Sequence, residues 1–341
     1  MIKQPLLFSK TNIIYLLIVG VMAVLPFVLD SRTMTILLTQ FCIFAILAMS
    51  YDILLGYTGI ISFGHAMFFG IGAYTTAIML SDFGPSIGIF AASIIVGIVL
   101  SAIISVISGA LTLRLKSHFY AMFTMAISGL FLVVAEKWRT VTKGNDGFTF
   151  RAPELFRERL YFYILVLICL VVIFILLKRV VASPFGKVLV AIRENEQRTR
   201  SLGYKTLGYK IIASVIAGAV ASLAGSLYAI SLRFVNTSVM TMDITLDALM
   251  MTIIGGVGTL IGPIIGAGVI EFAQHYLSGL AREYPIFERW IIFFGILYIL
   301  AVIFFPRGIV GTVSLRYHEW KLKKGQKTKA SVKLREKEIQ R

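Results

Sequence analysis

The sequence predicts an all-α integral membrane protein, a polytopic bundle of about ten transmembrane helices, some of them broken by glycines. Its composition supports this class, because 58% of the 341 residues are apolar and only 15% are charged. The mean hydropathy is +0.87. A soluble domain carries about 25% charged residues, so a soluble enzyme is disfavoured. Disorder is excluded because the chain contains too much apolar surface to leave in water.

Long apolar runs along the chain predict the individual spans, since a helix needs about 20 apolar residues to cross the hydrocarbon core. Helices are expected because backbone in lipid must satisfy its own hydrogen bonds. The run at 244–257 is short, and glycines interrupt those at 59–80 and 260–278, which we expect to be bent or re-entrant. The runs lie near 12–29, 34–55, 59–80, 86–113, 119–135, 160–177, 211–232, 244–257, 260–278 and 290–306.

The distribution of basic residues indicates the orientation of these spans. Lys and Arg gather in the segments that ten spans place on the side of the amino terminus, above all in 178–210 and 307–341. Because an excess of Lys and Arg marks cytoplasmic loops, we expect both termini in the cytoplasm. The net charge of +16 is then mostly an orientation signal, and no nucleic-acid partner is expected.

The two ends of the chain lead to separate expectations. The first apolar run is long for a secretory signal and has no small-residue cleavage site, so we expect an uncleaved first helix. Residues 1–306 then form the transmembrane domain, and 307–341 a basic, partly disordered cytoplasmic tail. This tail is either solvated or in contact with anionic lipid headgroups.

One segment, 183–203, has the pattern of a helix outside the membrane. Ser183 can cap its start, Pro184 suits the first helical position, and Gly203 can end it. Apolar residues line one face of the first half, and charged residues fill the second half. Such a helix either lies on the membrane surface or fits into the groove of a partner protein.

Three blocks of sequence resemble a known family. They read GKVLVAIRENEQRTRSLG from Gly186 to Gly203, with AGSLYA at 224–229, then GYTGIISFGHAMFFGIGAY at 56–74 and GGVGTLIGPIIGA at 255–267. In their order along the chain (56–74, 186–203, 255–267), they are similar to the permease subunits of ABC importers for branched-chain amino acids, and the resemblance extends over residues 45 to 305. The same blocks resemble permeases for urea and short amides, which remain an alternative substrate class.

The resemblance implies partners and a location. It implies a multi-pass protein of the prokaryotic plasma membrane that meets cytoplasmic ATPase subunits, a second permease subunit, most simply in a heterodimer, and an extracytoplasmic solute-binding protein. Segment 183–203 would be the cytoplasmic coupling helix. The residues it would use against the ATPase are Gly186, Arg193, Glu194, Glu196 and Gly203. The outer loop 136–159 is either a docking surface for the binding protein or a plain solvated loop.

The chain itself lacks the motifs of an enzyme. No G-x-x-x-x-G-K-[ST] phosphate-binding loop occurs in the sequence, so ATP hydrolysis is expected in a separate subunit. The four histidines are scattered and have no neighbouring cysteine, so no metal site and no cofactor are expected. A proton-coupled secondary transporter, using Asp52, His65 or Glu271, remains an alternative of another class, although such a carrier has no need of a partner-docking helix.

Polar and glycine residues inside the spans are candidates for the translocation pathway. A charge at the bilayer centre costs about 2.5–3.5 kcal/mol, and a broken helix must line a cavity or be buried. Segments 56–72 and 255–268 are therefore expected to flank the route, or to pack tightly without contacting solute. The candidates are Asp52, Gly56, Gly59, Ser62, His65, Gly255, Gly256 and Gly258.

The ionisable candidates each allow a structural interpretation. Asp52 either meets the ammonium group of a solute or accepts hydrogen bonds from backbone N–H groups at a helix break. His65 is expected to be a hydrogen-bonded helix residue. Glu271 and His275 stand four residues apart on one helical face, where a structural pair is expected.

Overall fold

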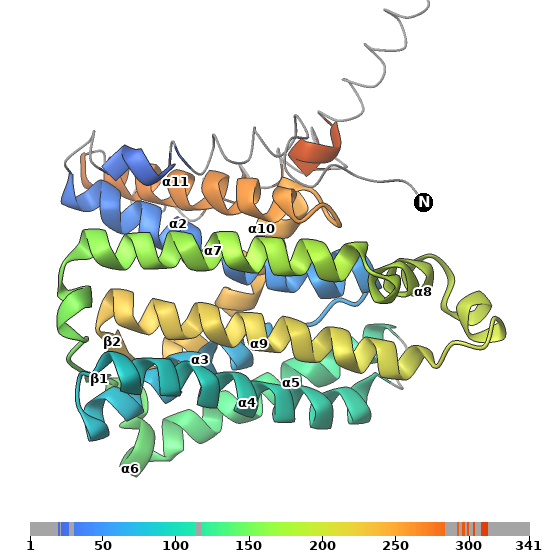
Figure 1. Ribbon diagram of the computed structural model, residues 1–341, viewed down its shortest axis with the longest axis horizontal. Helices are drawn as coiled ribbons and strands as arrows, with labels where there is room; N and C mark the ends of the chain where they lie inside the picture. Colours follow the sequence, from blue (N-terminus) through green and yellow to red (C-terminus); the bar gives the residue numbers. More distant parts are fainter. Residues whose placement is uncertain are drawn as a thin grey trace, which may run out of the picture.

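A computed structural model of the chain describes residues 31–113 and 117–283 continuously, with short stretches between 20 and 26 and between 292 and 312. These residues form a bundle whose long helices run alongside one another (Figure 1). The helices are α2 (Arg32–Asp52), the π-helix η1 (Ile53–Thr58), α3 (His65–Phe83), α4 (Ile87–Thr112), α5 (Ser117–Lys137), α6 (Arg139–Thr142), α7 (Arg159–Ala182), α8 (Pro184–Ser201), α9 (Thr206–Leu232), α10 (Met242–Gly255) and α11 (Ile261–Glu283). The predicted all-α class is confirmed.

Six helices in the described residues are long and apolar enough to cross a membrane. They correspond to six of the expected runs and comprise Arg32–Thr58, His65–Phe83, Ile87–Thr112, Phe119–Lys137, Arg159–Ala182 and Thr206–Leu232. The runs at 244–257 and 260–278 form α10 and α11, which are not among these six. The runs at 12–29 and 290–306 lie mostly outside the described residues, so about ten spans stays a prediction.

Small residues bring α3 and α9 into close contact at the centre of the bundle. A Cβ atom added at Gly72 would overlap the backbone carbonyl of Ser222, and one added at Gly225 would overlap that of Phe69. The Ser226 hydroxyl donates a hydrogen bond of 3.1 Å to the Gly72 carbonyl. Because lipid provides no hydrophobic drive between helices, such close backbone approach is a main source of helix association in membranes.

Helices α10 and α11 form a hairpin in which glycines again allow close backbone approach. This hairpin packs on α2. A Cβ atom at Gly255 would overlap the Gly262 backbone, and one at Gly266 would overlap the carbonyl of Met251. The Thr252 hydroxyl donates to the Ala48 carbonyl of α2 at 3.2 Å. The close contacts between α10 and α11 are therefore spaced four residues apart on each helix, which is about one helical turn.

The two ends of the bundle differ in structure. At one end, β1 (Phe148–Thr149) and β2 (Phe234–Val235) pair antiparallel, near the 3₁₀ turns η2 (Gly144–Asp146), η3 (Glu154–Arg157) and η4 (Thr237–Met240). Helix α8 lies at the opposite end of the bundle (Figure 1). Between the ends, α4, α5 and α7 expose large apolar side chains such as Ile103, Met122 and Ile168. Their outer surface therefore suits a hydrocarbon solvent.

Candidate functional site

The helical structure is interrupted between α2 and α3, as the glycines of 56–72 predict. Helix α2 ends at Asp52 and widens into the π-helix η1, which Gly59 terminates at φ 71°. A left-handed residue of this kind ends a helix at little cost only if it is glycine. Residues 59–64 are not helical, and α3 begins at His65. This part of the chain therefore contains the unsatisfied backbone groups of two helix ends.

Asp52 holds the loop that joins α10 to α11. Its Oδ1 accepts a hydrogen bond of 2.7 Å from the Gly258 amide, and its Oδ2 accepts one of 3.2 Å from the Leu260 amide. Both donors have positive φ, 77° at Gly258 and 55° at Leu260. Of the two interpretations of Asp52, the structure shows the one in which the carboxylate accepts from backbone N–H groups at a break.

The two glycine-rich segments meet around this carboxylate. A Cβ atom at Gly56 would overlap both Asp52 Oδ1 and the Gly258 backbone, and one at Gly258 would lie 3.1 Å from the Gly56 carbonyl oxygen. Asp52 is fully buried. We call Asp52, Gly56, Gly59, Gly258 and Leu260 the break cluster. Segments 56–72 and 255–268 are thus in contact, which the sequence suggested only through their shared glycine content.

The remaining pathway candidates lie beside the break cluster. Gly255 packs in the α10–α11 hairpin, and Gly256 has φ 129°. Ser62 is buried and accepts from the Gly64 amide at 3.3 Å. His65 Nε2 lies 2.7 Å from the Ser50 hydroxyl.

The Ser50 contact defines which His65 nitrogen carries a proton. The Ser50 hydroxyl donates to the Leu47 carbonyl at 2.6 Å, so its oxygen accepts from His65 Nε2–H. Nδ1 then has no hydrogen-bond partner among the described residues. His65 is a hydrogen-bonded helix residue, as its structural interpretation expected.

Helix α8 starts as predicted but is not continuous. The Ser183 hydroxyl accepts from the Gly186 amide at 3.4 Å, with Pro184 at the first helical position. At Asn195 the backbone is extended, with φ −160°. The Asn195 Oδ1 accepts from the Arg198 amide at 2.9 Å and so caps a second short helix. The expectation of one helix over 183–203 was therefore wrong, because the asparagine side chain competes with the helical backbone bonds.

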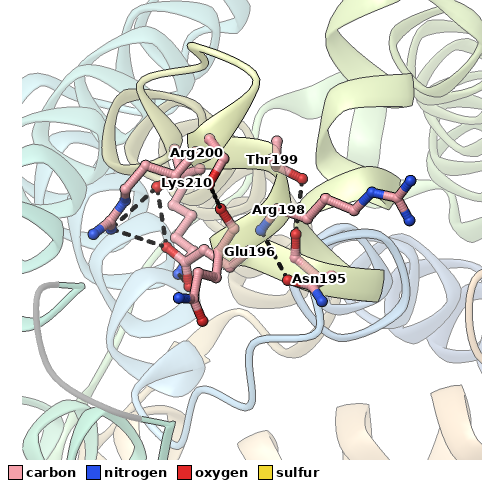
Figure 2. Close-up of polar contacts among 9 residues, drawn as sticks. Asn195, Glu196, Arg198, Thr199, Arg200 and Lys210 are labelled. Carbon is pink, nitrogen blue, oxygen red and sulfur yellow. Dashed lines mark hydrogen bonds and ion pairs between the residues drawn. The ribbon is translucent and has the colours of Figure 1, made fainter.

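Glu196 joins the second half of α8 to α9 (Figure 2). Its carboxylate accepts from Lys210 Nζ at 2.6 Å and from the Thr206 hydroxyl at 3.0 Å, and Arg200 lies 3.6 Å away. Partial burial by itself raises the pKa of the Glu196 carboxyl, but Lys210, Thr206 and Arg200 together lower it below its ordinary value. Glu196 thus stabilises the turn that Gly203, at φ 92°, allows between α8 and α9.

The other predicted coupling residues lie in different surroundings. Gly186 is buried at the first turn of α8, where a Cβ atom would overlap the Val181 carbonyl. Glu194 is exposed. Arg193 Nη1 donates to the Gly56 carbonyl of the break cluster. Whether any of these residues touches an ATPase stays a prediction.

One feature of α10 and α11 escaped sequence reasoning. One turn further along the α10–α11 hairpin, Asp247 comes near Glu271, and both carboxyl groups lie near Tyr228 of α9. Within the described residues no ion pair joins Glu271 to His275, which is exposed whereas Glu271 is buried. The expected pair was therefore wrong. Asp247 lies within the expected span 244–257 but was not singled out among the ionisable residues there.

Comparison with known proteins covers most of the chain. Residues 33–302 match a family described as the permease component of branched-chain amino acid transport systems. The chain is 26% identical over 329 residues to the high-affinity branched-chain amino acid transport system permease protein LivM of Salmonella typhimurium, covering 88% of this chain and 74% of that protein. No solved structure gives a significant match.

Two further relatives bear similar names. The LivM permease of Escherichia coli is 26% identical over 313 residues, which are 84% of this chain and 71% of that protein. A probable LivM permease of Methanocaldococcus jannaschii is 24% identical over 326 residues, 81% of this chain and 92% of that protein.

Proposed function

The chain belongs to the family of branched-chain amino acid transport permeases, and we propose from this membership that it is the transmembrane permease subunit of an ATP-driven ABC importer for branched-chain amino acids. The observation that carries the proposal is the family match over 33–302, joined with six apolar helices that suit a membrane. The chain is a transport component, and the sequence has no phosphate-binding loop, so ATP hydrolysis belongs to another subunit.

The orientation and partners complete this proposal. About ten spans in residues 1–306 cross a prokaryotic plasma membrane, with both termini and the basic tail 307–341 in the cytoplasm. Helix α8 then lies on the cytoplasmic side, where ATPase subunits bind segment 183–203. A second permease forms a heterodimer with this chain, and an external binding protein delivers the solute at the end that carries β1 and β2.

The solute route is proposed to pass next to the helix breaks of this chain. Support comes from the juxtaposition of segments 56–72 and 255–268, where two spans lose regular helical bonding at one place. Such breaks occur in transporters where backbone lines a cavity. Asp52 acts there as a holder of backbone, and His65 and Ser62 are the polar side chains nearest the route.

A reconstitution experiment tests the function. The chain is co-purified in detergent with its ATPase, its second permease and its binding protein, and then placed in sealed vesicles. We expect leucine, isoleucine and valine uptake that requires ATP and continues after the proton gradient is collapsed. Uptake of urea instead would overturn the substrate class. Solute accumulation by the purified chain alone, without nucleotide, would support a secondary transporter.

A further inference from the structure

Arg193 differs from the other charged residues of α8 in where its side chain ends. Its guanidinium donates to the Gly56 carbonyl in the π-helix that ends the α2 span. The same Nη1 lies 3.0 Å from the position that a Cβ atom would take at Gly258, in the α10–α11 loop. One side chain of α8 therefore contacts both halves of the break cluster.

Close packing at Gly59 supports this placement independently of the hydrogen bond. A Cβ atom at Gly59 would lie 2.9 Å from Arg193 Cγ and 3.6 Å from both its Cα and its Cβ. The backbone of α8 itself, and not only the end of a long side chain, thus touches the break after η1. Gly59 has φ 71°, so this contact involves a turn that only glycine adopts without strain.

Asp52, buried at the end of α2, contacts the same part of the backbone. It accepts hydrogen bonds from the amides of Gly258 and Leu260, while Arg193 donates to the Gly56 carbonyl. The negative side chain thus meets N–H groups and the positive one meets a carbonyl. No direct ion pair joins Asp52 and Arg193 within the described part of the chain. Three backbone groups at the two breaks, the amides of Gly258 and Leu260 and the carbonyl of Gly56, are satisfied in this way.

The first half of α8 is built into the bundle on the same side. Leu189 and Ile192 are buried, and the Phe185 ring stacks on Tyr209 of α9 with centroids 5.6 Å apart. Arg193 lies two residues before Asn195, where the backbone is extended. It therefore belongs to the anchored half. Arg193 is partly exposed, as Glu194 and Arg198 are, but its guanidinium reaches the break cluster.

We propose that Arg193 is a positioning residue that fastens the break cluster to helix α8, so that the two helix breaks move together with α8, and that it is not itself a contact for the ATPase. This inference rests on the proposed function. It assigns to Arg193 the link between the docking segment and two membrane helices. Loss of the side chain leaves α8 free to move without moving the breaks.

The first test uses Arg193→Gln in the complete importer in vesicles. The control is Arg179→Gln, an exposed arginine near the end of α7 and outside segment 183–203. We expect both variants to retain the ATPase subunits and to hydrolyse ATP. Leucine taken up per ATP hydrolysed should fall at least tenfold for Arg193→Gln only. Loss of the ATPase from the purified Arg193→Gln complex, or an unchanged ratio, would overturn the proposal.

A disulfide replaces the lost contact in the second test. The distance of 3.6 Å from the Gly59 Cβ position to Arg193 Cβ lies within the range of disulfides. In a chain carrying Cys42→Ala and Cys169→Ala, we combine Gly59→Cys with Arg193→Cys. Oxidation should form the bond and restore at least a third of the wild-type uptake per ATP, and reduction should remove it. Gly59→Cys strains the positive-φ turn, so the oxidised protein is compared with the reduced form of the same variant. A bond that forms without recovery of uptake per ATP contradicts the fastening role.

Hydrogen exchange separates this inference from the proposed function, since it needs no substrate. In the purified chain, Arg193→Gln should raise amide exchange in residues 53–60 and 256–262 at least tenfold, whereas Arg179→Gln should not. Unchanged exchange overturns the contact itself. Raised exchange in an importer that carries no leucine would leave the contact established and the proposed substrate wrong.

Discussion

The α3–α9 contact and the break cluster both depend on glycine, but for different physical reasons. Gly72 and Gly225 lie inside regular helices, where their missing side chains let two backbones touch. Gly59 and Gly258 have positive φ, and the backbone around them leaves its helix and needs polar partners. The first use sets the spacing of two helices. The second produces a helix break that Asp52 and Arg193 hold through backbone hydrogen bonds. The two regions thus differ in whether glycine serves packing or a change of backbone direction.

The largest loss of stability is expected where a new side chain collides with the backbone of a neighbouring helix. Gly225→Ala places a methyl group on the Phe69 carbonyl, and we expect a loss of about 3 kcal/mol of stability. Thermal unfolding in detergent, followed by size-exclusion chromatography, measures it. Gly208→Ala is the control on the same helix, because nothing lies within 4 Å of its Cβ position. Equal melting temperatures for the two variants would show that close packing at Gly225 does not stabilise the α3–α9 contact.

Removing the holder of the break cluster should have the next largest effect. Asp52→Ala leaves the amides of Gly258 and Leu260 without their acceptor. A buried donor left unpaired costs about 1–3 kcal/mol, and since Gly258 is only partly buried we expect about 2 kcal/mol in total. Asp52→Asn keeps one acceptor oxygen and should lose less in the same unfolding assay. If Asp52→Asn instead changes leucine affinity without changing stability, the carboxylate meets the solute.

A smaller effect is expected at the break within α8. Asn195→Ala removes the cap of the second short helix, which typically costs about 1 kcal/mol. The change should appear as faster hydrogen exchange in 196–201, with little effect on exchange in 53–60. Gln197→Ala, an exposed neighbour, serves as the control. Faster exchange in both segments would show that the two halves of α8 are not independent.

The smallest effect is the pH dependence that Glu196 contributes. Its folded-state pKa is lowered relative to the ordinary value of 4.5, so its stabilising contribution is present above pH 4.5 and is lost as the pH falls through the folded-state pKa. The side chain is 38% exposed, which makes this contribution small. Glu196→Gln should melt slightly lower than the wild type at pH 7, and the difference should shrink at pH 4. A constant difference between these pH values would contradict the pairing with Lys210.

Sequence reasoning was most reliable where composition and periodicity decide the structure. The apolar runs correspond to six membrane-length helices because about 20 apolar residues must cross the hydrocarbon core whatever they pack against. The start of α8 was predicted from Ser183 and Pro184, whose effect on a helix is local. The break after Gly56 was likewise visible from closely spaced glycines.

The break at Asn195 and the pairing of Glu196 could not be predicted in the same way. Asn195 stands between helix-forming neighbours, and helix continues on both sides of its extended backbone, so the local pattern predicts one helix. Glu196 finds Lys210 and Thr206 only because α9 folds back beside α8. The family resemblance implied that Arg193 and Glu196 face a partner protein. In the fold, each of them first satisfies a group of its own chain.

The amino-acid sequence by itself determined the class of this protein, its apolar helices and its family, because these follow from local hydrophobicity and from motifs read along the chain. The tertiary structure alone decided that Asp52, Gly56, Arg193 and Gly258 meet. They are separated by up to 206 positions in the sequence, and no local preference encodes their contact. It arises because donors and acceptors freed at two helix breaks must find partners across the bundle, where water is scarce.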